Sequence, residues 1–153
     1  MKISTKTRYA IRLLIEIGIR MEKEKYVSIS DISEKQAISE RYAEQILLTL
    51  KNAGILGSRR GIGGGFYLAK TAEDISVYDV YKTLDGEPDL VDCLATDFNC
   101  VREDACASKF VWADAKQAII DVFKKHTLKT LIEKQKKLTA INGDAKKWLG
   151  SYI

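Results

Sequence analysis

The residues with the clearest capacity for chemistry are three cysteines that all lie in one short segment. Cys93, Cys100 and Cys106 are separated by six and five residues. Thiolates are soft ligands that suit iron–sulfur clusters or zinc, but structural zinc usually takes Cys-x-x-Cys pairs, which this segment lacks. The spacing leaves two interpretations open: the thiols bind a metal or cluster, or they are free, with one or two packed into the core.

Three cysteines leave a four-ligand site incomplete, so the fourth ligand would be another side chain, a partner subunit's residue or an exogenous group. Carboxylates in the same segment could supply an oxygen: Asp92, Asp97, Glu103 and Asp104. The only histidine, His126, lies twenty residues past Cys106, where we expect it to interact with the dipole at a helix end rather than with a metal. With one histidine and no nucleophile motif, the sequence predicts a protein that is not an enzyme.

A glycine-rich run follows two adjacent arginines, Arg59 and Arg60, within residues 55–68. Its ends are β-prone and its middle is nearly all glycine, which predicts a two-stranded hairpin with a flexible tip. Glycine lets the backbone approach phosphates closely, so Gly63 and Gly64 are candidates for DNA contact, while the arginines supply charge to a tip in the minor groove. The run lacks the Gly-Lys-Ser/Thr of a Walker A loop and the third glycine of a dinucleotide fingerprint. A plain hairpin turn is the alternative interpretation.

The residues before this hairpin predict a helix-turn-helix. Ser28 can cap a short helix that ends near Gln36, and residues 37–38 make a tight turn. Ser39 can then cap a longer helix that ends near Ala53, directly before a glycine. A short helix, a tight turn and a longer helix form a helix-turn-helix. With the hairpin after it, the fold is predicted to be mostly α with a small β-hairpin wing.

The second of these helices has the polar face that reading double-stranded DNA requires. Arg41, Glu44 and Gln45 lie away from the predicted core, where arginine can read guanine and glutamine can read adenine in the major groove. Unpaired amides at the helix start, together with Ser39, could receive a phosphate, and Lys51 suits a second one. A solvated helix face is the alternative, but the cap, the turn and the spacing together favour DNA recognition.

The remaining elements that would position these residues are helices. Residues 4–21 carry one apolar stripe for the core and a second, at Ile11, Ile15 and Ile19, which needs either another subunit or a later segment of the same chain. Further helices are predicted from Ser76 to about Gly86, over residues 108–126, and over residues 128–137. The chain then divides into a DNA-binding domain (1–87), a cysteine-containing loop (88–107), a dimerisation helix (108–126) and a lysine-rich C-terminal tail (127–153).

The composition agrees with such a protein. Of 153 residues, 46% are apolar, enough for a packed core, and the net charge of +4 permits a nucleic-acid partner. The charged start is unlike a secretory signal, and no apolar stretch reaches the roughly 18 residues of a membrane span, so we expect a cytoplasmic protein. An odd number of cysteines in a reducing compartment argues against a disulfide framework.

Three segments carry a resemblance to a known family: residues 38–47 (ISERYAEQIL), 50–56 (LKNAGIL) and 58–68 (SRRGIGGGFYL). They look like the Rrf2 superfamily of bacterial winged-helix transcription regulators, whose members include IscR, NsrR, RirA and CymR. The likeness runs from about residue 1 to residue 125, and the Arg-Gly-x-Gly-Gly-Gly wing is its most specific part.

The resemblance implies a dimer, with a long dimerisation helix, that binds a palindromic operator. In cluster-binding members three cysteines lie between the domain and that helix, as Cys93, Cys100 and Cys106 do here, which implies a [2Fe-2S] or [4Fe-4S] cluster. The family would assign DNA contacts to recognition-helix and wing residues: Ser39, Arg41, Tyr42, Glu44, Gln45, Arg59 and Arg60.

Two positions depart from the family's pattern for the fourth ligand. IscR-like members use a histidine three residues after the last cysteine, where this chain has Lys109. Some nitric-oxide sensors take a carboxylate from the first helix of the other subunit, where it has Arg8. The resemblance therefore carries over neither a fourth ligand nor a cluster type.

Our leading hypothesis is a homodimeric repressor that responds, through a cluster on the three cysteines, to iron, redox state or nitric oxide. It places residues 112–123 and the stripe of Ile11, Ile15 and Ile19 in the two-fold interface. The alternative is a regulator of the same fold without a cluster, controlled by thiol oxidation, zinc or a partner protein. A redox enzyme or electron carrier is a third interpretation, which leaves the wing and the helix-turn-helix without a purpose.

Overall fold

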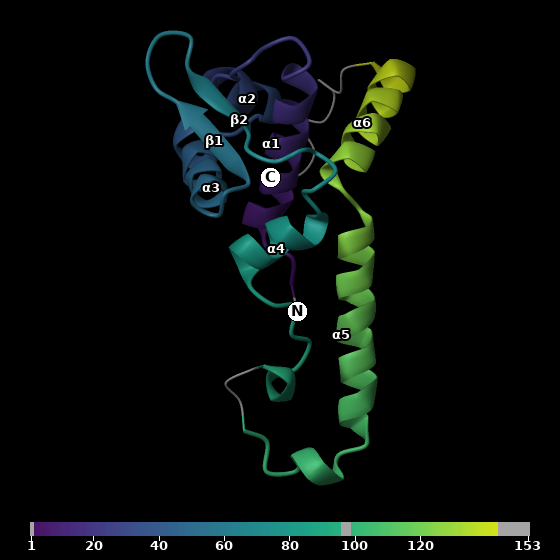
Figure 1. Ribbon diagram of the computed structural model, residues 1–153. Coiled ribbons are helices and arrows are strands. Elements are labelled where there is room, and N and C mark those ends of the chain that lie inside the picture. Colours follow the sequence, from purple (N-terminus) through teal and green to yellow (C-terminus); the bar gives the residue numbers. More distant parts are fainter. Residues whose placement is uncertain (1, 96–98, 144–153) are drawn as a thin grey trace.

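The computed structural model describes residues 2–95 and 99–143, which form a small helical domain, a hairpin and two C-terminal helices (Figure 1). The elements in chain order are α1 (Thr5–Arg20), α2 (Ile29–Gln36), α3 (Glu40–Asn52), β1 (Leu56–Arg59), β2 (Gly65–Leu68), α4 (Val77–Asp85), α5 (Ser108–Lys125) and α6 (Leu128–Asn142). Two single 3-10 turns, η1 (Asp92–Leu94) and η2 (Glu103–Ala105), lie between α4 and α5. The prediction of a mostly α fold with a hairpin wing is confirmed.

Serine side chains begin the first four helices. The hydroxyl oxygens of Ser4, Ser28, Ser39 and Ser76 each accept a hydrogen bond from the backbone amide three residues further on, at 3.1–3.2 Å. Each cap satisfies an amide that the helix itself cannot pair. Between α2 and α3, Ala37 adopts the left-handed conformation with φ 53°, which makes the predicted tight turn. These local signals account for why the predicted helix starts are confirmed.

The core lies where α1 crosses α2, α3 and α4. Ala10, Leu13, Leu14 and Ile17 of α1 are fully buried, as the first predicted stripe requires. The rest of the core comes from the other helices, the hairpin and the segments that connect them: Val27, Ile32, Ala43, Ile46, Leu47, Leu50, Ile55, Leu56, Phe66, Ile75, Val80, Leu128 and Ile132.

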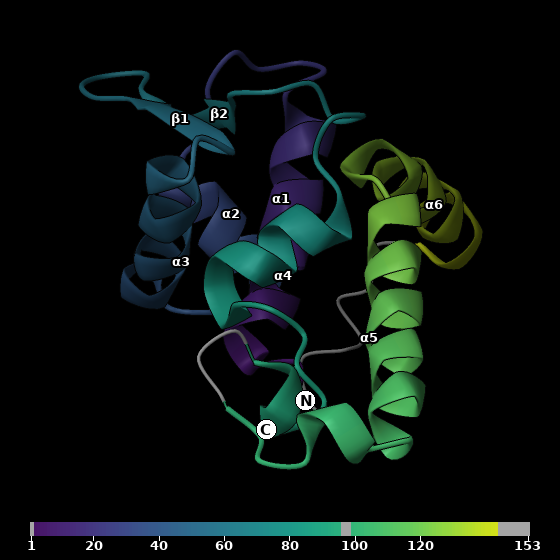
Figure 2. The same ribbon diagram turned by 60° about the horizontal axis from the view of Figure 1, so that its bottom comes forward.

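The wing is an antiparallel hairpin in which Leu56 pairs with Leu68 and Arg59 with Gly65. It is also joined to the loop between α1 and α2, because Val27 and Phe66 exchange two backbone hydrogen bonds of 2.9 Å. Phe66 is buried in the core below. The base of the wing is therefore held by main-chain bonds and by packing, while its tip projects beyond the helices (Figures 1 and 2).

Helix α6 returns to the domain and packs along α1 (Figures 1 and 2). The chain that enters it is joined to the residues before α4 by three backbone hydrogen bonds: Val77 N–H to the His126 carbonyl, Leu128 N–H to Ile75, and Lys129 N–H to Ala72, at 2.7–2.9 Å. Leu128 and Ile132 are buried. The segment predicted as a lysine-rich tail with a short helix thus contributes a longer helix and part of the core.

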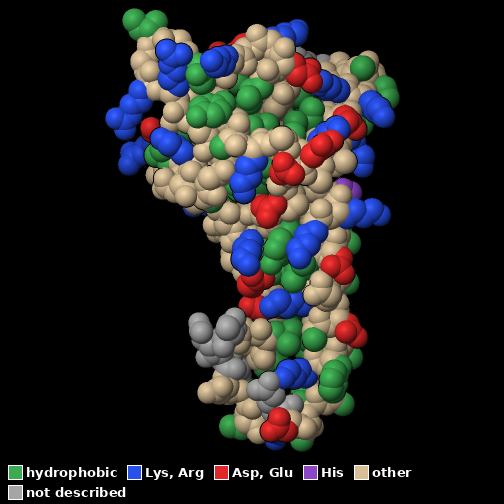
Figure 3. All heavy atoms as spheres, in the orientation of Figure 1, with side chains coloured by type: hydrophobic (Ala, Val, Ile, Leu, Met, Phe, Trp, Pro, Cys, Tyr) green, Lys and Arg blue, Asp and Glu red, His purple; other side chains and the backbone are tan. Residues whose placement is uncertain are grey.

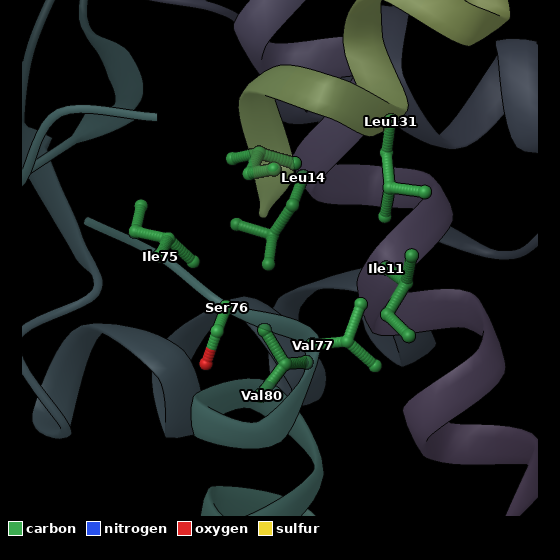
Figure 4. A pocket seen from close by; sticks show the side chains of 8 residues that line it. Ile11, Leu14, Ile75, Ser76, Val77, Val80 and Leu131 are labelled. Carbon is green, nitrogen blue, oxygen red and sulfur yellow. The ribbon is translucent and has the colours of Figure 1, made fainter. Parts of the chain in front are cut away.

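This packing bears on the second stripe on α1. Ile11, Ile15 and Ile19 are partly buried against the core of the same chain, so the stripe does not require another subunit, and its place in a two-fold interface stays a prediction. Figure 4 shows Ile11 of α1, Val77 of α4 and Leu131 of α6 around one small apolar pocket. The alternative, a later segment of the same chain, is the one observed. In α6 the apolar residues recur at intervals of three and four, and many lysines lie among them, so the sequence shows only a weak apolar stripe there.

Helix α5 extends away from the domain as a long arm (Figure 1). Near its end Ile120 is buried and Phe123 packs on Tyr81 of α4, with ring centroids 5.3 Å apart. Four of its other apolar side chains are exposed: Phe110, Val111, Trp112 and Val122. Of the earlier expectations, those for Asp97 and for residues 144–153 fall outside the described residues, and so does the side chain of Glu103. Among the described helices, none is long and apolar enough to cross a membrane.

Candidate nucleic-acid interface and cysteine segment

Helix α3 separates an apolar face from a polar one. Ala43, Ile46, Leu47 and Leu50 are fully buried and fix the helix against α1 and α2. Arg41, Glu44 and Gln45 are exposed on the other side, with the half-exposed Leu48 beside them. The second helix of a helix-turn-helix reads base edges with residues placed this way. The fold therefore leaves the predicted reading residues available, and their contacts with bases stay a prediction.

Two of the predicted contact residues also stabilise the fold around the start of α3. The Ser39 hydroxyl oxygen accepts the Tyr42 amide at 3.2 Å, which leaves its O–H as the group able to donate to a phosphate. The Tyr42 ring is half-buried and packs edge-on against Tyr9 of α1, with centroids 5.8 Å apart. Tyr42 thus holds the start of α3 against α1, a role that the sequence reasoning did not include.

The wing arginines differ in their surroundings. The Arg59 guanidinium lies over the Tyr26 ring at 5.3 Å, and Tyr26 in turn packs edge-on against Tyr67 of β2 at 5.6 Å. The Lys25 ammonium lies 5.7 Å from the same Tyr26 ring. Arg60, the next residue, is exposed. The sequence reasoning did not select Tyr26. Its only signal in the sequence is that it is aromatic and directly precedes the residue that pairs with the wing.

The wing glycines are explained first by the hairpin. The Gly64 amide donates to the Gly61 carbonyl at 3.0 Å and closes the turn, in which Gly63 has φ 70°. A Cβ on Gly64 would collide with the Arg59 carbonyl. Both glycines are thus needed for the turn itself, so the hairpin alternative accounts for them as well. Their approach to a phosphate stays a prediction.

Basic side chains accompany this surface. Arg41 on α3 and Arg59 and Arg60 on the wing are exposed, and Lys51 near the end of α3 is half-buried. Figure 3 shows several Lys and Arg side chains on the side of the molecule where α3 and the wing lie, with others spread over the rest of that face. Positive side chains attract the phosphate backbone, and their contribution weakens as salt rises.

The cysteine segment, residues 88–107, is arranged differently. Cys93 in η1, Cys100 in a loop and Cys106 after η2 are all half-buried free thiols. Within the described residues, no three Cys, His, Asp or Glu side chains come together as a metal site. The donor types fit iron–sulfur chemistry, since thiolates are the ligands that cluster iron prefers. The arrangement does not bring those donors to one point.

Cys106 has the most distinctive thiol surroundings. Its sulfur lies 3.2 Å from the Ser108 hydroxyl at the start of α5. Hydrogen bonds from the Ser108 side chain and from the Lys109 amide, together with the charge of Arg102, lower the pKa of the Cys106 thiol. A lower pKa increases the thiolate fraction, and thiolate is both the nucleophile and the metal ligand.

Polar contacts connect this segment to the helices on either side. The Lys116 ammonium of α5 pairs with Asp89 at 2.5 Å, and both side chains are about three-quarters buried. Glu87 accepts from the Tyr78 hydroxyl at 3.0 Å and pairs with Lys82 at 2.6 Å, both on α4. The start of the cysteine segment is therefore linked to α5 through Asp89, and Glu87, directly before the segment, is linked to α4.

Comparison with known proteins agrees with this architecture. Residues 3–134 match the Rrf2 family, described as iron-dependent transcriptional regulators. The chain is 36% identical over 132 residues to Protein rrf2 of Nitratidesulfovibrio vulgaris, covering 86% of this chain and 87% of that one. It is 33% identical over 138 residues to the regulator IscR of Pectobacterium carotovorum, covering 90% and 83%.

A solved structure shows the same fold. CymR, the global cysteine regulator of B. subtilis, superposes with a TM-score of 0.71 at 30% identity, covering 88% of this chain and 98% of that one. The family match spans most of the chain and agrees with the fold, so this chain belongs to the Rrf2 family of transcriptional regulators.

Proposed function

We propose that this regulator is a repressor that binds a palindromic operator as a homodimer and that its DNA affinity depends on the state of Cys93, Cys100 and Cys106. The observation that supports it most directly is the exposed polar face of α3 beside a wing with two arginines. Because its target would be bacterial DNA, we place its action in the cytoplasm.

The proposed DNA contacts divide into base reading and phosphate binding. In the major groove, Arg41 would read guanine, Gln45 adenine and Glu44 the amino group of cytosine. Phosphates would be held by the remaining predicted residues, which line the helix ends and the wing: Ser39, Tyr42, Lys51, Arg59, Arg60, Gly63 and Gly64. Phosphate contacts fix the register of the protein on the duplex, and base contacts supply the sequence choice.

The dimer proposal rests on α5. Phe110 is 73% exposed and Val111 59% exposed, with Trp112 and Val122 adding to the same helix. Exposed apolar side chains along one long helix are typical of a surface that another copy covers. A two-fold axis at α5 would let two α3 helices enter successive major grooves, about 34 Å apart.

We propose the three cysteines as ligands of an iron–sulfur cluster, [2Fe-2S] or [4Fe-4S]. When bound, the cluster would supply a centre that responds to iron, redox state or nitric oxide. Residues 92–106 would have to close together for their thiolates to reach one cluster. Since the segment is tied to α4 and to Lys116 of α5, a change in its conformation would shift the population of dimers able to bind DNA.

A second candidate has no cluster. The lowered pKa of the Cys106 thiol favours direct thiol oxidation, and no fourth ligand can be named from Lys109 or Arg8. Zinc or a partner protein could also control a regulator of this fold. The likeness to CymR, described as a cysteine regulator, is compatible with this alternative.

Anaerobic purification separates the two candidates. A cluster predicts visible charge-transfer absorption with iron and sulfide in integral ratio per chain. Replacing Cys93, Cys100 or Cys106 by alanine should abolish both the colour and the response of DNA binding to oxygen or nitric oxide. Asn99→Ala, in the same segment, is the matched control. Colourless protein that binds DNA and cannot be reconstituted with iron and sulfide would favour the cluster-free candidate.

A further inference from the structure

The tip of the wing carries an isoleucine that nothing in the described structure covers. Ile62 is 107% exposed, fully open to solvent. Figure 3 shows a hydrophobic side chain at the outermost point of the projecting loop. Single exposed apolar residues are common on protein surfaces, so the place of Ile62, rather than its exposure alone, needs an explanation.

The turn does not require this side chain. The hydrogen bond from the Gly64 amide to the Gly61 carbonyl, 3.0 Å long, leaves Ile62 and Gly63 at the two central positions. Gly63 has φ 70°, as the third residue of a type II turn requires. The second position, which Ile62 fills, favours proline and accepts polar residues. A β-branched apolar residue there is therefore explained neither by the turn nor by packing.

The stem below the tip is anchored. Val27 and Phe66 exchange two backbone hydrogen bonds, and the Arg59 guanidinium lies over the Tyr26 ring. The tip is thus presented in a defined direction on a fixed base. Arg59 and Arg60 directly precede the turn, so positive charge and an apolar side chain are offered together.

We propose that Ile62 is a wedge that inserts between base pairs from the minor groove of bound DNA. Arginine is attracted to the negative potential of a narrow minor groove, and apolar side chains inserted at a base step unstack it and bend the duplex. This inference rests on the proposed DNA binding and adds to it bending and a preference for easily unstacked steps such as TA and CA/TG.

The test uses the full chain and duplexes that it selects from a random-sequence pool. Dyes at the duplex ends report bending by energy transfer, and 2-aminopurine placed at successive steps reports unstacking. The unaltered protein should bend the duplex and raise 2-aminopurine fluorescence at one step near each wing. Ile62→Ser should lose both signals and bind about tenfold more weakly, while Ile62→Leu keeps them. The salt dependence should not change, because Ile62 contacts no phosphate.

Ile141→Ser is the matched control, since Ile141 is 79% exposed and lies on α6, away from the wing (Figure 1). It should leave binding, bending and unstacking unchanged. The wedge is overturned if the unaltered protein binds DNA without bending it, or if Ile62→Ser bends and unstacks the duplex as the unaltered protein does, whatever its affinity. Failure of the unaltered protein to select any duplex would instead count against the proposed DNA binding itself.

Discussion

The region that would read DNA and the segment that carries the cysteines differ in how firmly their side chains are held. In the first, fully buried residues lie behind the exposed polar side chains of α3, as Ile46 and Leu47 lie behind Gln45. In the cysteine segment, Pro88 alone among the described residues is buried. Its polar contacts lie near its two ends, at Asp89 with Lys116 and at Cys106 with Ser108.

This difference matches what the two regions would have to do. A base-reading face must offer fixed donors and acceptors, because each lost bidentate contact weakens discrimination between bases. A segment that responds to a signal needs two arrangements close in free energy, and sparsely packed segments are where such local changes occur. The contrast teaches that a packed surface proposed to read DNA and a loosely held segment proposed to respond to a signal can occur in one small chain.

The largest expected difference between the two regions comes from truncating one leucine to alanine in each. Leu47→Ala should lower the free energy of unfolding by about 2–5 kcal/mol, because a fully buried leucine leaves a cavity in the core. Leu94→Ala, at a half-buried position of the cysteine segment, should cost clearly less. Urea unfolding followed by circular dichroism measures both. Equal losses in the free energy of unfolding would show that the cysteine segment is packed as tightly as the region that would read DNA.

The next effect concerns exposed residues of the two regions. Arg60→Ala and Gln45→Ala should each weaken operator binding by about 1–3 kcal/mol. Loss of a phosphate contact at Arg60 should reduce the slope of log affinity against log salt concentration by about one unit. Loss of a base contact at Gln45 should leave that slope unchanged and relax the choice of DNA sequence.

Arg102→Ala is the matched control for these two variants, because Arg102 is an exposed arginine of the cysteine segment. It should bind the same duplex with unchanged affinity in a fluorescence anisotropy titration. A loss at Arg102 as large as at Arg60 would move the DNA surface toward the cysteine segment. Unchanged binding by all three variants would remove the reading face from α3 and the wing.

The parts of the fold that were predictable are those written in local signals. Ser28, Ser39 and Ser76 marked helix starts because a hydroxyl cap acts within three residues, and a glycine run marked the wing tip. The α5 boundaries also followed from period alone, since the predicted 108–126 compares with Ser108–Lys125 observed.

Contacts between distant segments were not predictable in the same way. The second stripe on α1 showed that a partner was needed, but nothing in its spacing distinguishes α6 of the same chain from another subunit. Tyr26 beneath Arg59 depends on the Val27–Phe66 pairing, which joins residues far apart in sequence. The proposed convergence of the three cysteines would likewise depend on how a sparsely packed loop closes, which residue type and spacing leave open.

A smaller effect is expected at the wing, within the region that would read DNA. Tyr26→Leu should weaken DNA binding by about 0.5–1 kcal/mol, because the ring that holds Arg59 over its face is lost. Tyr26→Phe, which keeps an aromatic face, should bind normally. On an Arg59→Ala background, Tyr26→Leu should have no further effect in the same titration. An undiminished effect on that background would mean that Tyr26 acts independently of Arg59.

The smallest expected effect concerns the link between the two regions. A double-mutant cycle of Asp89→Asn and Lys116→Met in urea unfolding should give a coupling of about 0.2–1 kcal/mol, near the upper end because both side chains are about three-quarters buried. The Glu73–Lys129 pair, whose side chains are at least half exposed, should couple more weakly. A coupling near zero for Asp89 and Lys116 would contradict this tie between the cysteine segment and α5. The thiols would then be connected to α5 through the packing of η1 on that helix and through Cys106, whose sulfur lies 3.2 Å from the Ser108 hydroxyl.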